Sequence, residues 1–147
     1  MLTRKKLKQP TIARKSENGF YQQFKTAVKK LDRKIKLTRL ECWVGAGTPD
    51  VLVYDELGAF HFVELKYTET NKVNFEPTQI SWHARHQDGS VWVFVKQRKK
   101  DGTSDCLVYP AKSVIDLATD GIKETKPALV CAEPFDWDKI LQLTCPS

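Results

Sequence analysis

The chain has 147 residues, 41% of them hydrophobic and 29% charged, which fits one globular domain with a sizeable core. No apolar run approaches the ~20 residues of a membrane span, and no apolar stretch follows the basic opening MLTRKKLKQP, so we expect no secretory signal. The net charge of +6 is uneven, because residues 1–40 hold 13 of the 24 Lys and Arg residues but only two acids. This imbalance favours a polyanion partner, either nucleic acid or a membrane surface, with a solubilising tail as the alternative.

Residues 1–15 are predicted to form a flexible basic arm ahead of the first helix. Ser16 is a typical N-cap residue. The apolar face that follows has helical spacing and consists of Phe20, Phe24, Ala27, Val28 and Leu31. The loose alternation of Ile35–Val44 predicts a strand, and the glycines of Gly45–Pro49 predict a loop.

Two strands, Asp50–Asp55 and Ala59–Lys66, are predicted to pair as a hairpin around a tight turn. Pro77 fits the first position of a second helix, and Val91–Val95 is the most apolar strand of the chain. A further strand and two short helices are predicted at Cys106–Tyr109, Ala111–Thr119 and Trp137–Leu143. The order α-β-β-β-α-β predicts an α/β fold with a mixed sheet flanked by helices, in one domain with a core at about 16–96 and an extension at about 97–147.

Three ionisable side chains are predicted to meet at one end of this hairpin. Side chains alternate along a strand, so Glu64 and Lys66 share one face, with Phe60 and Phe62 behind them. Asp50 opens the neighbouring strand, across the hairpin from the end that carries Glu64 and Lys66. Because a buried strand normally avoids such groups, we interpret them as a site.

The chemistry of such a site follows from its residue types. Two carboxylates and backbone carbonyls are oxygen ligands that suit Mg²⁺, which takes its other ligands from water and phosphate. The metal can lower the pKa of a bound water and polarise the phosphate. A neighbouring lysine can orient the attacking water and balance the charge that develops. Two acids and a lysine therefore predict metal-assisted hydrolysis of phosphodiester bonds.

The sequence P-D, a gap of 13 residues, and E-x-K resembles the signature of the PD-(D/E)xK nuclease superfamily over about residues 14–96. The resemblance implies a restriction-endonuclease-like core with the element order given above. It implies that Asp50 and Glu64 bind the metal together with the backbone carbonyl of Leu65, and that Lys66 is the catalytic lysine. Mg²⁺ is the implied cofactor, with Mn²⁺ as its substitute.

Two further residues match positions that recur in this superfamily. Glu17 would lie on the first helix and face the metal, and Gln79 would lie on the helix after E-x-K; both are candidate catalytic residues. The segment after E-x-K is similar to that of RecU-like Holliday-junction resolvases, although Thr78 stands where their helix has a histidine. VRR-Nuc-like phage nucleases share the pattern G-x-P-D, E-x-K and Q, and stay a rival interpretation.

Junction resolution implies a C2 homodimer, because paired nicks in a near-twofold DNA junction need two active sites. The resemblance further implies branched DNA as the partner, no membrane, and the cytoplasm of a bacterium or of a phage-infected host. We expect DNA shape rather than base reading to set specificity. The basic residues expected to hold phosphates are Arg4, Lys5, Lys6, Lys8, Arg14, Lys15 and Lys72.

Two functional classes stay open. The first is a structure-selective DNA endonuclease, which includes nicking and flap enzymes; the second is a non-catalytic basic nucleic-acid-binding protein whose acids serve in salt bridges. The complete motif favours the enzyme, because a binding module gains nothing from acids where phosphates approach. The histidines and cysteines are expected to be structural, the cysteines as reduced thiols: His61, His83, His86, Cys42, Cys106, Cys131 and Cys145.

Overall fold

The computed structural model describes residues 12–40 and 45–147, with side chains from residue 16 onward. These residues form an α/β fold, as predicted. Its elements are, in chain order, α1 (Ile12–Lys30), β1 (Lys36–Arg39), β2 (Val51–Tyr54), β3 (Phe60–Thr68), α2 (Pro77–Arg85), β4 (Val91–Arg98), β5 (Ser104–Pro110), the 3₁₀ turn η1 (Ala111–Ser113), α3 (Val114–Asp120), β6 (Leu129–Ala132) and α4 (Trp137–Thr144).

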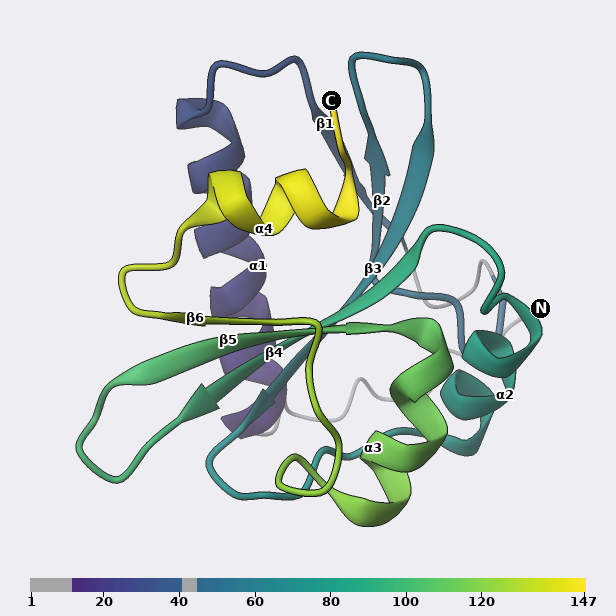
Figure 1. Ribbon diagram of the computed structural model, residues 1–147, viewed down its shortest axis with the longest axis vertical. Coiled ribbons are helices and arrows are strands. Elements are labelled where there is room, and N and C mark those ends of the chain that lie inside the picture. The colour runs from purple at the N-terminus through teal and green to yellow at the C-terminus, as the bar shows by residue number, and fades with distance from the viewer. Residues whose placement is uncertain (1–11, 41–44) are drawn as a thin grey trace, which may run out of the picture.

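The strands form one six-stranded mixed sheet in the order β1-β2-β3-β4-β5-β6. β3 and β4 are parallel, and every other neighbouring pair is antiparallel. A parallel pair needs a crossover connection, which α2 supplies. Figure 1 shows the result, with α2 beside α3 and with α4 beside α1. The mixed sheet flanked by helices, predicted from the element order, is confirmed.

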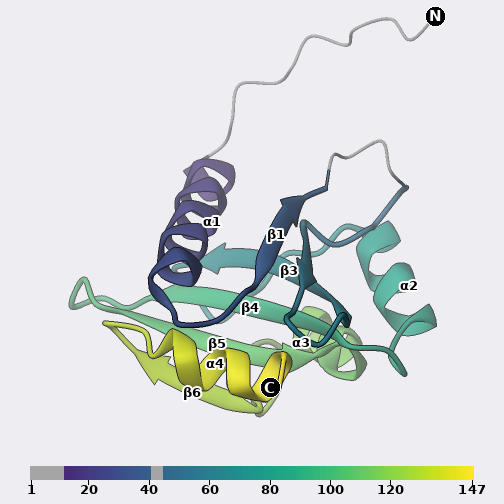
Figure 2. The ribbon, with the colours of Figure 1, turned by 90° about the horizontal axis from the view of Figure 1, so that it is seen from above.

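Helices cover both faces of the sheet, so β3 is buried on both sides and reads as a nearly continuous buried run. Val63 and Leu65 point toward the core cluster under α1 and α4, which also contains Phe20, Phe24, Phe94, Trp137 and Ile140. The alternate residues Glu64 and Lys66 lie opposite Val93 and Val95, whose side chains belong to the cluster under α2 and α3. In Figure 2, α1 and α2 stand to either side of β1 and β3. The catalytic candidates on β3 therefore share the face that α2 and α3 cover.

Some boundaries differ from the predictions. α1 begins at Ile12, so Ser16 lies inside the helix and the predicted N-cap was wrong; residues 12–15 contain no glycine or proline that would prevent the helix from starting earlier. Residues 12–15 are consequently helical, whereas the rest of the predicted arm lies outside the described residues. The described part of the first predicted strand is Lys36–Arg39; residues 41–44 are outside the description.

The C-terminal part of the sheet is larger than predicted. β4 continues to Arg98 and β5 starts at Ser104, because their ladder runs on through polar pairs such as Gln97 with Asp105. β6 was not predicted at all; it pairs with β5 and carries one buried side chain, Cys131. No helix among the described residues has the length and apolar character to cross a bilayer.

Candidate active site

The site lies in a notch where β2 has not yet begun and β3 continues alone. β2 pairs with β3 only as far as Val51 opposite Val63, while β3 runs on to Thr68. Asp50 occupies the gap: its Oδ2 accepts a hydrogen bond of 2.9 Å from the backbone N–H of Leu65. Because the N–H and C=O of one strand residue point to the same side, the Leu65 carbonyl also faces this notch. Asp50 thus lies beside the end of the strand that carries Glu64 and Lys66, as predicted.

The loop before Asp50 is held against the start of α2. Gly47 has φ +83°, and a Cβ added there would lie 2.0 Å from the backbone oxygen of Thr78. Only glycine allows both this conformation and this approach. On the other side, Leu40 N donates to the Asp50 carbonyl over 2.8 Å. The Asp50 backbone is therefore fixed between β1 and the N-terminus of α2.

Gln79 links the lysine to the second carboxylate. Lys66 Nζ donates to Gln79 Oε1 over 2.9 Å, and Gln79 Nε2 donates to Glu64 Oε1 over 2.9 Å. Gln79 Oε1 also accepts the backbone N–H of Glu76 over 2.9 Å, which fixes the amide at the N-terminus of the helix. The Lys66 ammonium lies 4.8 Å from the ring centroid of Phe75. The two hydrogen bonds of Gln79 thus hold the side chains of Lys66 and Glu64 in one orientation.

Glu64 carries the most unusual electrostatics of the site. Its side chain is 1% exposed, and Oε2 has no hydrogen-bond partner among the described residues. Burial, and then the negative charge of Asp50, hold the pKa of Glu64 well above its usual range, although Lys66 opposes the shift. An acid in this position is stabilised by a cation that approaches Oε2.

The five predicted catalytic residues line one groove with a cavity volume of about 730 Å³. α1 contributes Glu17, the hairpin contributes Asp50, Glu64 and Lys66, and α2 contributes Gln79. The charge of Glu17 adds a small contribution to the raised pKa of Glu64, which places this glutamate in the same electrostatic environment. The structure therefore brings together all the predicted catalytic side chains.

The donor set suits a hard cation that keeps much of its own hydration. The described residues contain no group of three or more His, Cys, Asp and Glu side chains arranged to hold a metal. Two carboxylates, one with an orphaned buried oxygen, and the Leu65 carbonyl are nevertheless present. Mg²⁺ commonly binds through one or two carboxylates with water and phosphate as its remaining ligands. The residues therefore fit the metal implied by the sequence.

The predicted phosphate-binding residues are placed less fully. Arg4, Lys5, Lys6 and Lys8 lie outside the described part of the chain. Arg14 and Lys15 fall in α1, but their side chains are not described. Lys72 is exposed in the connection between β3 and α2 and is not among the residues that line the groove.

The predicted structural histidines do not line the groove. His83 is fully buried, its Nδ1 donates to the Gln79 carbonyl over 2.8 Å, and burial lowers its pKa. His86 stacks on Trp82 at 3.8 Å between ring centroids. His61 forms part of a second buried polar cluster with Asp55 and Ser90. All three have packing or hydrogen-bond partners, as expected for structural residues.

The second polar cluster lies at the turn end of the same hairpin. His61 Nε2 donates to Asp55 Oδ2 over 2.6 Å, and His61 Nδ1 lies 2.5 Å from Ser90 Oγ. Asp55 Oδ1 accepts the N–H groups of Leu57 and Ala59. Ser90, His61 and Asp55 form a chain of hydrogen bonds like that of a catalytic triad. However, Ser90 Oγ also accepts Trp92 Nε1–H, and none of the three residues lines a described cavity. The cluster therefore fixes the turn and the start of β4.

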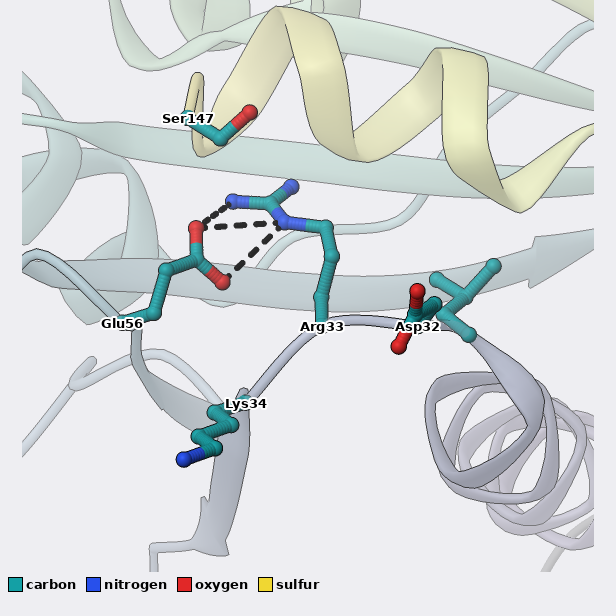
Figure 3. A pocket seen from close by; sticks show the side chains of 6 residues that line it. Asp32, Arg33, Lys34, Glu56 and Ser147 are labelled. Carbon is teal, nitrogen blue, oxygen red and sulfur yellow. Dashed lines mark hydrogen bonds and ion pairs between the residues drawn. The ribbon is translucent and has the colours of Figure 1, made fainter.

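A shallower hollow of about 500 Å³ lies next to this turn (Figure 3). Arg33 reaches across it to the carboxylate of Glu56 and donates through Nη2 to the Cys145 carbonyl over 2.7 Å. The hydrogen bond to Glu56 raises the pKa of Arg33. This arginine ties the end of α1 to the hairpin turn and to the end of α4, which is a structural role.

Sequence reasoning missed several groove residues. Arg39, Tyr21 and Phe75 line the groove, although none of the three was predicted as a site residue. Arg39 and Tyr21 meet only because β1 folds against α1, and a contact between two elements leaves no local pattern. The alternation of side chains along β1 could have indicated the position of Arg39. Arg39 lies two residues after Leu37, so its side chain leaves the strand on the face that packs on the core.

No protein-family model matches this chain, and no curated protein matches it. The function of the groove therefore has to be inferred from the residues that line it.

Proposed function

We propose that the chain is a metal-dependent, structure-selective DNA endonuclease of the PD-(D/E)xK type. The observation that carries the proposal is the buried Glu64 carboxylate, whose Oε2 has no partner among the described residues and which lies beside Asp50 in an open groove. A buried, unpaired acid next to a second acid is costly unless something neutralises it. A divalent cation from solvent does so.

Asp50, Glu64 and the Leu65 carbonyl are the groups that would hold the metal. When bound, the metal supplies a Lewis acid for the phosphate and a more acidic water. Asp50 Oδ2 already accepts the Leu65 N–H, so the strand itself orients this carboxylate before any ligand arrives. Such preorganisation reduces the reorganisation needed at the moment of reaction.

Lys66 and Gln79 act on the phosphate side of the reaction. Lys66 Nζ is held by Gln79 and by the ring of Phe75, and no carboxylate of the described part of the chain forms an ion pair with it. Its positive charge is therefore available to the attacking water and to the negative charge that grows on the phosphate. Gln79 orients both Lys66 and Glu64, since one amide bonds to the two side chains.

The non-catalytic alternative is less consistent with these contacts. In a binding protein the acids would form salt bridges, yet neither Asp50 nor Glu64 makes an ion pair among the described residues. Asp50 and Glu64 both line the groove, where their negative charges would repel a nucleic acid if no metal were bound. The groove is therefore better suited to hydrolysis than to binding alone.

Cleavage assays on matched DNA structures test the proposal. Wild-type protein should hydrolyse labelled DNA only when Mg²⁺ or Mn²⁺ is added, and Asp50→Ala and Glu64→Ala should lose cleavage while they still bind DNA. Asp116→Asn, an exposed acid on α3, is the matched control and should cleave as the wild type does. Binding without hydrolysis under every divalent metal would contradict the enzyme proposal.

The substrate is tested in the same assay. The similarity to RecU-like resolvases makes a four-way junction the first substrate to try, beside nicked, flapped and linear duplexes. Symmetric paired nicks across the junction would support a homodimeric resolvase. Preferential cleavage of flaps or nicks would support the VRR-Nuc-like alternative instead.

A further inference from the structure

Arg39 is a second fixed cation in the groove. It is the last residue of β1 and pairs with Val51, next to Asp50 in the chain. Its side chain is exposed and lines the same groove as Asp50 and Glu64. Arg39 contacts Tyr21 of α1, whereas Lys66 contacts Gln79 of α2 and the nearby ring of Phe75. The groove that holds the carboxylates thus carries one cation in contact with α1 and another in contact with α2.

Two contacts with α1 restrict the Arg39 side chain. Its guanidinium carbon lies 4.9 Å from the ring centroid of Tyr21, and its Nη2 donates to Asn18 Oδ1. Asn18 and Tyr21 are three residues apart and so lie on one face of the helix. A long exposed arginine normally samples many rotamers, and stacking on a ring reduces that freedom. Arg39 is therefore preorganised before a ligand binds.

The partners that Arg39 has among the described residues are neutral, which distinguishes it from Arg33. Arg33 donates to a carboxylate, whereas Arg39 contacts an amide and a ring and makes no ion pair within the described ranges. A guanidinium has five N–H donors in a planar fork, and one bond to Asn18 leaves the others able to engage an anion. A planar cation in a groove is well suited to bidentate contact with a phosphate.

We propose that Arg39 binds a backbone phosphate of the nucleic acid strand in the groove, next to the phosphate that is hydrolysed. The inference rests on the proposed function for the identity of the strand, but its physical basis is separate from the metal site. Asp50 and Glu64 serve the reacting phosphate. The nucleic acid strand continues beyond that phosphate, and a positive charge beside α1 is needed to hold its next phosphate. Arg39 is then a binding residue that positions the strand.

Fluorescence anisotropy with labelled DNA in EDTA tests this role without any hydrolysis. Arg39→Ala should weaken binding about tenfold and reduce the slope of log affinity against log salt by about 1, as the loss of one phosphate contact predicts. Arg39→Lys should keep the salt slope but lose several-fold in affinity, because a lysine makes no bidentate contact. Arg98→Ala, an exposed arginine at the end of β4, is the matched control and should change affinity less than twofold.

The structural role of Arg39 is measured separately. If Arg39 only tied β1 to α1, Arg39→Ala would lower the melting temperature and leave the salt slope at the wild-type value, which would overturn the proposal. Asn18→Ala removes the tether but keeps the guanidinium, so its salt slope should stay at the wild-type value while affinity falls moderately. An affinity and a slope for Arg39→Ala that equal those of Arg98→Ala would also overturn it.

Two further measurements distinguish binding of a strand phosphate from binding of free phosphate, and phosphate binding from cleavage. Competition with inorganic phosphate at constant ionic strength should displace little DNA; complete displacement would overturn the assignment to a strand and indicate a site for free phosphate. Asp50→Ala should abolish cleavage yet keep the effect of Arg39→Ala on binding. If the wild type binds DNA with the expected Arg39 dependence but never cleaves it, the proposed function fails and the phosphate contact stands.

Discussion

The β2–β3 hairpin buries acidic side chains at both of its ends, and the two ends satisfy them to different degrees. At the turn, Asp55 accepts two backbone N–H groups and the His61 ring N–H, and the hydrogen bond to His61 lowers the pKa of Asp55. At the open end, Glu64 accepts one hydrogen bond from the described residues, donated by Gln79, and burial raises the pKa of Glu64. Both side chains are almost completely buried.

We interpret this difference as the one between a structural polar cluster and a candidate binding site. A buried acid with complete hydrogen bonding stabilises one conformation of the chain around it. A buried acid with a free oxygen destabilises the protein until a ligand completes its coordination. The Asp55 cluster lines no described cavity, whereas Glu64 and Asp50 both line the groove. The comparison therefore predicts stability effects at one end and activity effects at the other.

The largest effect is expected from Asp50→Asn. An asparagine oxygen can still accept the Leu65 N–H, so the fold should keep its stability, while the metal loses one of two charged ligands. We expect the cleavage rate to fall about 10³-fold, or about 4 kcal/mol of transition-state stabilisation. Single-turnover cleavage and urea unfolding of the same preparation measure both quantities. Lost activity that is matched by lost stability would contradict the separation of the two ends.

The reverse behaviour is expected from Asp55→Ala. Removing this carboxylate leaves two backbone N–H groups and the His61 ring without their acceptor, which should reduce the free energy of unfolding by about 3 kcal/mol. Glu64→Gln is the matched change at the other end and should leave stability unchanged or raise it, because it removes an unpaired buried acid. Urea unfolding in EDTA makes the comparison. Equal losses in the two variants would show that both clusters are structural.

The arrangement of the candidate site at the open end of the hairpin could be predicted because its signal is local. Strand alternation places Glu64 with Lys66, and the short turn places Asp50 opposite them. By contrast, β6 escaped prediction because it is a four-residue edge strand with one buried side chain, and an edge strand of that kind has little hydrophobic pattern. The contact between Arg39 and Tyr21 escaped for another reason: it depends on how α1 crosses β1, which no spacing within either element encodes.

The roles of Gln79 and Gly47 lie between these cases. Both belong to recognisable segments, yet their function depends on the approach of the Gly45–Pro49 loop to the start of α2. The position of Gln79 on the helix does not tell which of its atoms donates to Glu64 and which accepts from Lys66. Tertiary contact decides such details.

A smaller effect is expected from Gly47→Ala, which tests how the loop positions Asp50. The added Cβ would collide with the Thr78 backbone, so the loop must move, at a cost of about 2 kcal/mol. Gly102 is a matched control, since it also has a positive φ but nothing within 4 Å of an added Cβ. Gly102→Ala should cost about 1 kcal/mol from backbone strain alone and leave cleavage unchanged. If Gly47→Ala cleaves DNA as well as Gly102→Ala does, the loop does not position Asp50.

The smallest effect is the pH dependence of the Asp55 cluster, measured with Asp55→Asn. The pKa of Asp55 is lower in the folded protein than in the unfolded chain, so the ionised carboxylate contributes stability that is fully present above about pH 4 and is lost as the pH falls through the folded value. The difference in the free energy of unfolding between wild type and Asp55→Asn should therefore be constant near neutral pH and shrink in acid. At neutral pH it should be smaller than the loss caused by Asp55→Ala. Urea midpoints from neutral pH to about pH 2 measure it, with Asp116→Asn as the control for a surface acid. A difference that stays constant down to the lowest pH would mean that backbone hydrogen bonds, rather than the charge of Asp55, hold the turn.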